Sequence, residues 1–351
     1  MPYRSPRTST VKRFARASAI LGVTATSLAL TIVGPDASAV AGASTSTPNF
    51  SGVTINFADQ FKEYQTVFAA TNALKGAKYK VSWSEFVGGP PIIAAETGGS
   101  VDLGDMAETP TIFAQAAGDP VKVVAVTKGA NPNSSPIGIV VPKGSSITKV
   151  SQLRGKSIAV QEGTVEQYVL IRILKKAGIP YSAVTVDNIP VTSASTAVTN
   201  GKVDAAVLSQ PLTGLDLREG KITQLVSAAG YTQTFGYLTA SQAALNNPAK
   251  AAALADFIKR FYKAQAILTK NPQLAAKTYV TTFGVPLSVA EQAVKSISAV
   301  GTPITTAIIS YQQTEANTFQ QLGLISHGLN VAKIFDLPYN AAIAKKAGLM
   351  S

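Results

Sequence analysis

The sequence predicts an α/β fold of two similar lobes, each built on a parallel-rich sheet, followed by a group of C-terminal helices. Strand and helix patterns alternate through most of the first 230 residues, which is typical of parallel sheets with crossover helices. A short motif also recurs about one hundred residues further on, which indicates two related units rather than one long sheet.

The first 39 residues have the three parts of a secretory signal peptide. A basic leader is formed by Arg4, Arg7, Lys12, Arg13 and Arg16. The apolar stretch Ala17–Ile32 follows, and Ala37-Ser38-Ala39 offers a small-residue cleavage site. Residues 40–48 (VAGASTSTP) then predict a flexible tether. Because no later stretch reaches the roughly 18 apolar residues of a membrane helix, we expect an exported, soluble protein in the periplasm or cell-envelope space.

Composition excludes several kinds of chemistry. The 351 residues include no cysteine and one histidine, His327. Disulfides and thiol nucleophiles are therefore excluded, and most zinc sites and Ser-His catalysis are disfavoured. We expect no catalytic residue, no metal and no cofactor.

Removal of residues 1–39 takes away five of the 31 basic residues and one of the 19 acidic residues, which leaves a formal charge of +8. This surplus favours anionic partners, but the lysines are scattered and the chain is exported, so no nucleic acid is expected.

The elements of the first lobe follow one another closely. We expect strands over 53–57, 80–86, 101–105 and 121–127, with helices over 64–74, 90–96 and 110–117. In the second lobe, strands are expected over 157–161, 184–189, 203–208 and 222–228, with helices over 166–177 and 195–200. The repeat relates "AAETGGSVDLGDMAETP" (94–110) to "TAVTNGKVDAAVLSQP" (196–211): each has a short helix, Gly-x-Val-Asp, a strand and a proline turn.

The C-terminal third is predicted to be helical and to cover the lobes. Apolar residues at helical spacing predict a helix over 248–270, Ser288 with Glu291 forms a capping-box pattern, and another helix is expected over 305–322. The extended segments 136–141 and 235–239 are candidates for two crossings between lobes. The expected domains are therefore residues 49–136 and 238–351 for a discontinuous lobe I, and residues 137–237 for lobe II.

Several strand-to-helix turns have the features of anion-binding sites. In open α/β sheets, ligands bind beyond the carboxyl ends of the strands, where helix N-termini present free N–H groups. Gly88-Gly89 precedes Pro90, Thr109 precedes Pro110, and Thr164 stands three residues before Gln167. Two lobes with such turns could hold a small anion from both sides.

Two stretches resemble a known family. "SEFVGGPPIIAAETGGSVDLGDMAETPTIFAQAAG" (84–118) and "VSQLRGKSIAVQEGTVEQYVLIRILKKAGI" (150–179) are similar to segments of the aliphatic-sulfonate-binding proteins of ABC importers. The resemblance extends from about Val53 to about Gly323. It implies a two-lobed periplasmic-binding-protein fold (type II) that closes on its ligand by a hinge motion. It also implies a monomer that binds a small anion, such as a sulfonate, and passes it to an ABC transporter permease.

The resemblance implies a set of ligand-binding positions between the lobes. They are Asp59, Gln60, Gly88, Gly89, Pro90, Glu108, Thr109, Gly163, Thr164, Val165, Thr192, Ser193 and Gln210. Thr164 and Val165 are expected to contribute through their backbone N–H groups as well as the Thr164 hydroxyl. This sequence departs from the family at Glu108, where relatives often have a small residue, and at Ser209-Gln210, where tryptophan or aspartate is common. No arginine falls in a predicted ligand turn.

Proteins of the same scaffold include enzymes as well as binding proteins for other ligands. A sulfinate desulfinase uses a cysteine and the pyrimidine synthase of thiamin biosynthesis uses histidine and cysteines, so this cysteine-free chain disfavours both. A binding protein for nitrate or a thiamin precursor remains an alternative, as does a scavenger or sensor that serves no transporter.

Overall fold

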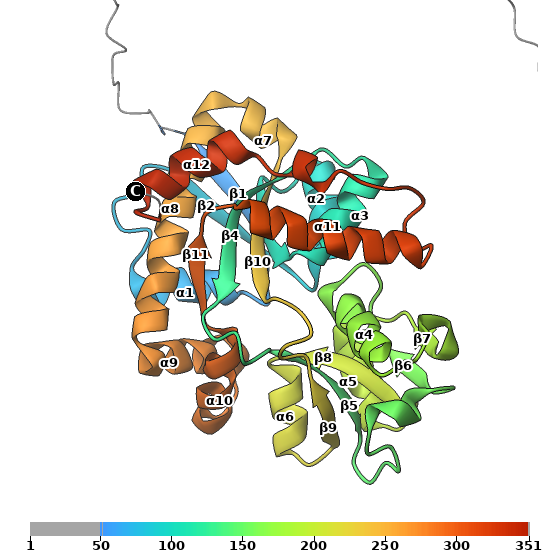
Figure 1. Cartoon of the computed structure of the whole chain (residues 1–351). Coiled ribbons are helices and arrows are strands. Elements are labelled where there is room, and N and C mark those ends of the chain that lie inside the picture. The colour runs from blue at the N-terminus through green and yellow to red at the C-terminus, as the bar shows by residue number, and fades with distance from the viewer. Residues whose placement is uncertain (1–49, 51, 350–351) are drawn as a thin grey trace, which may run out of the picture. The chain divides into compact units, whose positions relative to one another are not determined.

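The computed structural model describes residue 50 and residues 52–349, which belong to one unit containing two sheets. A six-stranded sheet in the order β11-β4-β10-β3-β1-β2 defines lobe I. A five-stranded sheet in the order β7-β6-β8-β5-β9 defines lobe II (Figure 1). The expected signal peptide (1–39) and tether (40–48) lie outside the described residues.

Lobe I is built from both ends of the described chain. Its first part contains β1 (Thr54–Gln60), α1 (Glu63–Thr71), β2 (Lys80–Phe86), α2 (Gly89–Thr97), β3 (Leu103–Ala107), α3 (Thr109–Ala117) and β4 (Val121–Gly129). Its second part contains β10 (Phe235–Ser241), α7 (Gln242–Asn246), α8 (Pro248–Lys270), α9 (Pro272–Phe283), α10 (Leu287–Ile297), β11 (Ala299–Thr302), α11 (Thr306–Gln321), the 3-10 helix η3 (Val331–Ile334) and α12 (Leu337–Lys346).

Lobe II is formed by the continuous middle of the chain. It contains β5 (Ile137–Pro142), η1 (Val150–Leu153), β6 (Ser157–Ala159), α4 (Val165–Lys176), η2 (Tyr181–Ala183), β7 (Thr185–Asp187), α5 (Val191–Thr199), β8 (Ala205–Ser209), α6 (Leu212–Arg218) and β9 (Ile222–Ser227). The two-lobed α/β fold expected from the sequence is therefore confirmed.

The repeated aspartate has the same structural role in both lobes. Asp102, just before β3, accepts a hydrogen bond from the backbone N–H of Asn56 in β1 at 2.9 Å. Asp204, just before β8, accepts one from the N–H of Ser157 in β6, also at 2.9 Å. Each carboxylate thus ties the beginnings of two neighbouring parallel strands together. A lysine pairs with each: Lys250 at 2.6 Å from Asp102 and Lys156 at 3.3 Å from Asp204.

Strand direction in both sheets follows from where the chain enters each lobe. β5 begins lobe II and is antiparallel to both of its neighbours, β8 and β9. β10 begins the return to lobe I and is antiparallel to β3 and β4. The chain enters each sheet from the other lobe, at the edge where the parallel strands of that sheet end. β5 and β10 must therefore run antiparallel to those strands. The sheets are consequently mixed: β1, β2, β3 and β4 share one direction, with β10 and β11 opposed.

Three expectations about local structure need correction. Phe235–Tyr237, assigned to lobe II, belong to lobe I, because β10 pairs with β3 and β4 and so satisfies its backbone on both edges. Helix α5 starts at Val191, four residues before the expected start. Ser288 forms no cap, because α10 already begins at Leu287 after Pro286.

Helices cover both faces of the lobe I sheet. A core of aromatic and aliphatic side chains lies between β1, α1 and α8 and includes Phe57, Phe68 and Phe257. A second core joins α2 and α3 to β4 and β10. Among the described residues, no helix is both long enough and apolar enough to cross a membrane.

Candidate functional site

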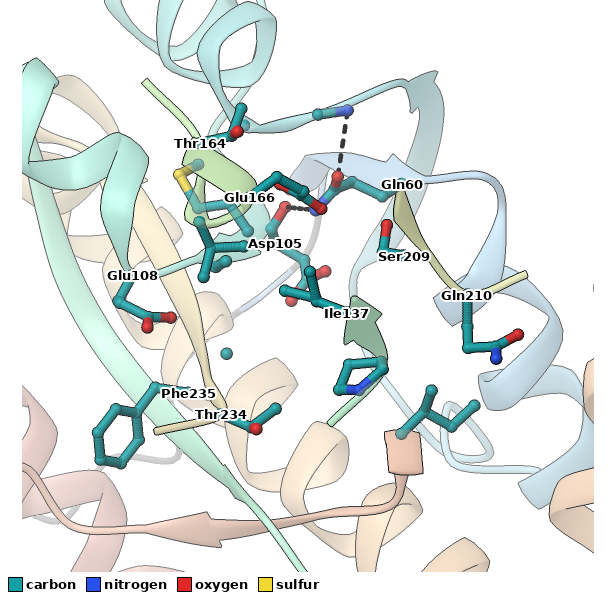
Figure 2. A pocket seen from close by; sticks show the side chains of 18 of the residues that line it. Gln60, Asp105, Glu108, Ile137, Thr164, Glu166, Ser209, Gln210, Thr234 and Phe235 are labelled. Carbon is teal, nitrogen blue, oxygen red and sulfur yellow. Dashed lines mark hydrogen bonds between the residues drawn. The ribbon is translucent and has the colours of Figure 1, made fainter. Parts of the chain in front are cut away.

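A cavity of about 260 Å³ lies between the two lobes. Gln60, Glu108 and Phe235 line it from lobe I, and Thr164 and Ser209 line it from lobe II (Figure 2). Val165 also belongs to the lobe II wall. The two connections between the lobes also contribute, through Ser135-Pro136 and Thr232–Thr234. A molecule in this cavity would therefore touch both lobes and both crossings.

Contacts between the lobes flank the cavity. Tyr168 and Ile171 of α4 pack in one buried cluster with Ile112 of α3 and Phe319 of α11, and the rings of Tyr168 and Phe319 are 5.9 Å apart. Elsewhere, Leu215 of α6 packs against the cluster formed by α9 and α10. The described conformation is thus one in which the lobes touch.

The predicted convergence of helix starts is present in the cavity wall. Gly89 begins α2 and Val165 begins α4, while Glu63 and Val191 begin α1 and α5, and all four line the cavity. The first N–H groups of α4 and α5 have no partner within the helix and can act as donors. At the start of α1 the N–H groups of Tyr64 and Gln65 already donate to Asp59, and the start of α2 has two prolines, which carry no N–H. The carboxyl ends of the central strands therefore form the site, as expected for an open α/β sheet.

Gly89 is required by the close packing of two helix starts. A Cβ atom at this position would lie 2.4 Å from Cγ of Pro110 and 3.2 Å from Cβ of Met106. Only glycine leaves room for the start of α2 to lie against the start of α3. The two strand-to-helix turns follow each other closely in the sequence because α2 has only nine residues and β3 only five.

Seven of the thirteen expected ligand-binding residues line the cavity. They are Gln60, Gly88, Gly89, Glu108, Thr164, Val165 and Gln210. The other six are Asp59, Pro90, Thr109, Gly163, Thr192 and Ser193, which the structure does not place in the cavity wall.

The residues outside the wall have other contacts or face solvent. Asp59 is fully buried and accepts hydrogen bonds from the N–H groups of Tyr64 at 2.9 Å and Gln65 at 2.7 Å, so it caps α1. The hydroxyl of Thr109 donates to Glu315 on α11. Thr192 and Ser193 are exposed, because successive helical residues are rotated by about 100° and the first residue of α5, Val191, already faces the cavity.

Two turns are held in shape by side-chain amides. Nε2 of Gln60 donates to the Asp105 carbonyl at 3.0 Å, and its Oε1 accepts from the N–H of Gly88 at 3.1 Å (Figure 2). In lobe II, Oε1 of Gln167 accepts from the N–H of Gly163 at 2.9 Å. The Thr164 hydroxyl makes no cap, contrary to the capping pattern, because it donates to the Gln161 carbonyl at 2.7 Å.

The cavity wall is acidic. It contains Glu63, Asp105, Glu108 and Glu166, and its described residues include no lysine, arginine or histidine. Burial raises the pKa of Glu63 to about 7 and raises the pKa of Glu166. Burial also raises the pKa values of Asp105 and Glu108 well above the usual range. In their protonated forms these groups can donate hydrogen bonds.

Several wall residues were not expected from the sequence. Glu63 and Glu166 lie in the first turns of their helices, so an inspection of every first-turn side chain would have found them. Tyr279 and Phe283 on α9 have no local signal, since tertiary packing alone brings them to the cavity. Among the described residues, no group of three or more acidic, histidine or cysteine side chains is placed to hold a metal ion.

Comparisons with known proteins agree with this architecture. The model of the NMT1/THI5 like family matches residues 91–275. An aliphatic sulfonates-binding protein of Escherichia coli (strain K12) is 28% identical over 270 residues, which cover 76% of this chain and 83% of the relative. The taurine-binding periplasmic protein of the same strain is 26% identical over 170 residues, covering 48% of this chain and 52% of the relative.

A solved structure shows the same fold. The alkanesulfonate-binding protein SsuA from Xanthomonas axonopodis pv. citri, bound to MOPS, has a TM-score of 0.75 and is 25% identical. The match covers 81% of this chain and 98% of the solved chain. The fold is therefore the two-lobed periplasmic-binding-protein fold, and all three of these relatives are named as binding proteins rather than enzymes.

Proposed function

Because this chain belongs to the NMT1/THI5-like family, we propose that it is an extracytoplasmic solute-binding protein that captures a small organosulfonate and delivers it to an ABC importer. The observation that supports this function best is the 260 Å³ cavity lined by both lobes and both crossings. A ligand there stabilises the closed arrangement to the extent that it binds that arrangement better than the open one. The permease then recognises the closed, ligand-bound form of the protein.

The anionic end of the ligand is held by neutral donors. The start of α4 offers backbone N–H groups, Gly89 offers its own N–H at the start of α2, and Ser209 and Thr234 add hydroxyls to the wall. The protonated forms of Asp105 and Glu166, which burial favours, add further donors. Binding of a sulfonate therefore needs no arginine, although its affinity depends on orientation.

Calorimetry with the mature protein tests the ligand class. Propanesulfonate, taurine and MOPS represent the sulfonates, and nitrate, sulfate, acetate and a pyrimidine represent the alternatives. We expect heat of binding only with sulfonates, and a raised melting temperature in their presence. Binding of nitrate or the pyrimidine alone would instead assign the protein to one of those ligands. As a control for the desulfinase alternative, incubation with an aromatic sulfinate should release no sulfite.

A further inference from the structure

One acidic side chain in the cavity wall has no hydrogen-bond partner. Glu108 is 1% exposed, and neither of its carboxylate oxygens is hydrogen-bonded in the structure. Figure 2 shows the carboxylate on the side of the cavity where Phe235 and Thr234 lie, well apart from Thr164 and Gln60. An ionised carboxylate in such surroundings is costly unless a donor or a cation meets it.

A second buried carboxyl lies behind Glu108. Glu315 of α11 is fully buried, its Oε1 accepts from the Thr109 hydroxyl, and its Oε2 has no partner. The charge of Glu315 adds to burial in raising the pKa of Glu108, which shows that the two groups interact. The phenol of Tyr237, also buried, is without a partner as well. This end of the cavity therefore has three unpartnered carboxyl oxygens, together with a phenol that can donate as well as accept.

The cavity wall offers no basic side chain to balance them among its described residues. Glu108 differs from the other acids of the wall, Glu63, Asp105 and Glu166, which are only partly buried and can reach water. Glu108 is thus the wall carboxylate whose missing partner a ligand is best placed to supply.

We propose that Glu108, with Glu315 behind it, receives a protonated amino group, so that the solute class of this protein is a small sulfonate bearing an amine. The inference rests on the proposed function, which supplies the sulfonate end of the ligand. The amine end is inferred from Glu108. An ammonium group fits because it offers three donors and a full positive charge to the unpartnered oxygens. An alkyl group of the same size would leave both oxygens of Glu108 buried without a donor.

A matched pair of ligands tests the amine. Taurine and 1-propanesulfonate have the same number of heavy atoms and differ in an ammonium against a methyl group. We expect taurine, or its three-carbon homologue, to bind at least tenfold more tightly by calorimetry. In Glu108→Gln the preference should disappear, because the amide keeps the shape of the side chain and loses its charge. Glu291→Gln makes the same charge change at an exposed position of α10 and should retain the preference.

The release of a proton on ligand binding gives a second test of the amine subsite. The ionisable groups that interact with Glu108 come from three elements: Glu315 and Tyr311 on α11, Tyr237 on β10, and Glu166 and Tyr168 on α4. Because burial favours the protonated acid, an arriving ammonium should displace a proton from Glu108. Titrations in two buffers of different ionisation enthalpy should show this release with the aminosulfonate, and show it reduced in Glu108→Gln. Melting curves of both variants confirm that they are folded.

The outcomes separate this inference from the proposed function. Equal affinity for taurine and propanesulfonate, unchanged by Glu108→Gln, would overturn the amine subsite and leave a sulfonate-binding protein. Binding of butylamine with no sulfonate binding would support the amine subsite and overturn the sulfonate function. If no probe binds, both proposals fail.

Discussion

The position of Asp59 in the sequence suggests a ligand-binding role, but its contacts show a structural one. It stands in a turn that the resemblance places at the ligand, but its carboxylate is used by the N–H groups of Tyr64 and Gln65 at the start of α1. Burial raises its pKa to about 6, while these hydrogen bonds oppose the rise. Its role is therefore to hold the first turn of α1, whose residue Glu63 lines the cavity.

This role predicts a loss of stability in Asp59→Ala. The N–H groups of Tyr64 and Gln65 lose their acceptor, so we expect a cost of roughly 2–3 kcal/mol in the free energy of unfolding, measured by urea denaturation. Asp59→Asn keeps one acceptor oxygen but turns an NH2 donor toward the other N–H group, so it should restore only part of the loss. If Asp59→Ala instead kept its stability and lost only ligand affinity, the capping role would be wrong.

At the scale of elements, the start of α2 depends on the start of α3. The two helices follow β2 and β3, which both flank β1 in the sheet, and they meet at Gly89 and Pro110. Their closeness brings Gly88, Gly89 and Glu108 into one wall of the cavity. The position of Glu108 is therefore set by packing between elements and not by its own turn alone.

Substitution of Gly89→Ala tests this packing. The new methyl group would lie 2.4 Å from Cγ of Pro110, so the helix starts must separate. We expect a loss of about 1–3 kcal/mol of stability and at least tenfold weaker ligand binding. Pro110→Gly removes the obstructing ring, so a double-mutant cycle should show that Gly89→Ala costs much less in its presence. Additive effects in the cycle would mean that the contact does not restrict residue 89.

At the scale of the whole molecule, buried carboxyls dominate the response to pH. Burial raises the pKa of Glu96 and Glu315 to about 8, and that of Glu63 to about 7, from an ordinary value of 4.5. Each group binds its proton more tightly in the folded protein than in the unfolded chain. Between pH 4.5 and 8 the folded state therefore holds more protons, and stability falls as the pH rises through this window.

Urea unfolding at pH 5 and pH 8 should accordingly show a lower free energy of unfolding at pH 8. Glu96→Gln should reduce the difference, because its amide oxygen can still accept from the Thr239 hydroxyl and no longer titrates. Glu291→Gln, which changes an exposed carboxyl, should leave the difference as it is. Stability that rises from pH 5 to pH 8 would show that these groups are ionised in the folded protein.

The sequence by itself determined the two-lobed fold and the general position of the site. Alternating strands and helices, the repeated Gly-x-Val-Asp and the glycine-proline turns are local patterns, and they depend on residues close together in the chain. Asp102 and Asp204 have equivalent roles in the two lobes because the repeated pattern places each before a central strand. Gly88, Gly89 and Thr164 reach the cavity because helix starts follow the carboxyl ends of the strands.

Tertiary structure alone decided which side chains at those turns face the ligand. Val191 faces the cavity from the start of α5, and the next two residues, Thr192 and Ser193, are exposed. Glu315 reaches Thr109 from 206 residues away along the chain. Such contacts depend on how whole helices pack, and side-chain direction and burial follow from that packing. No local pattern in the sequence encodes them.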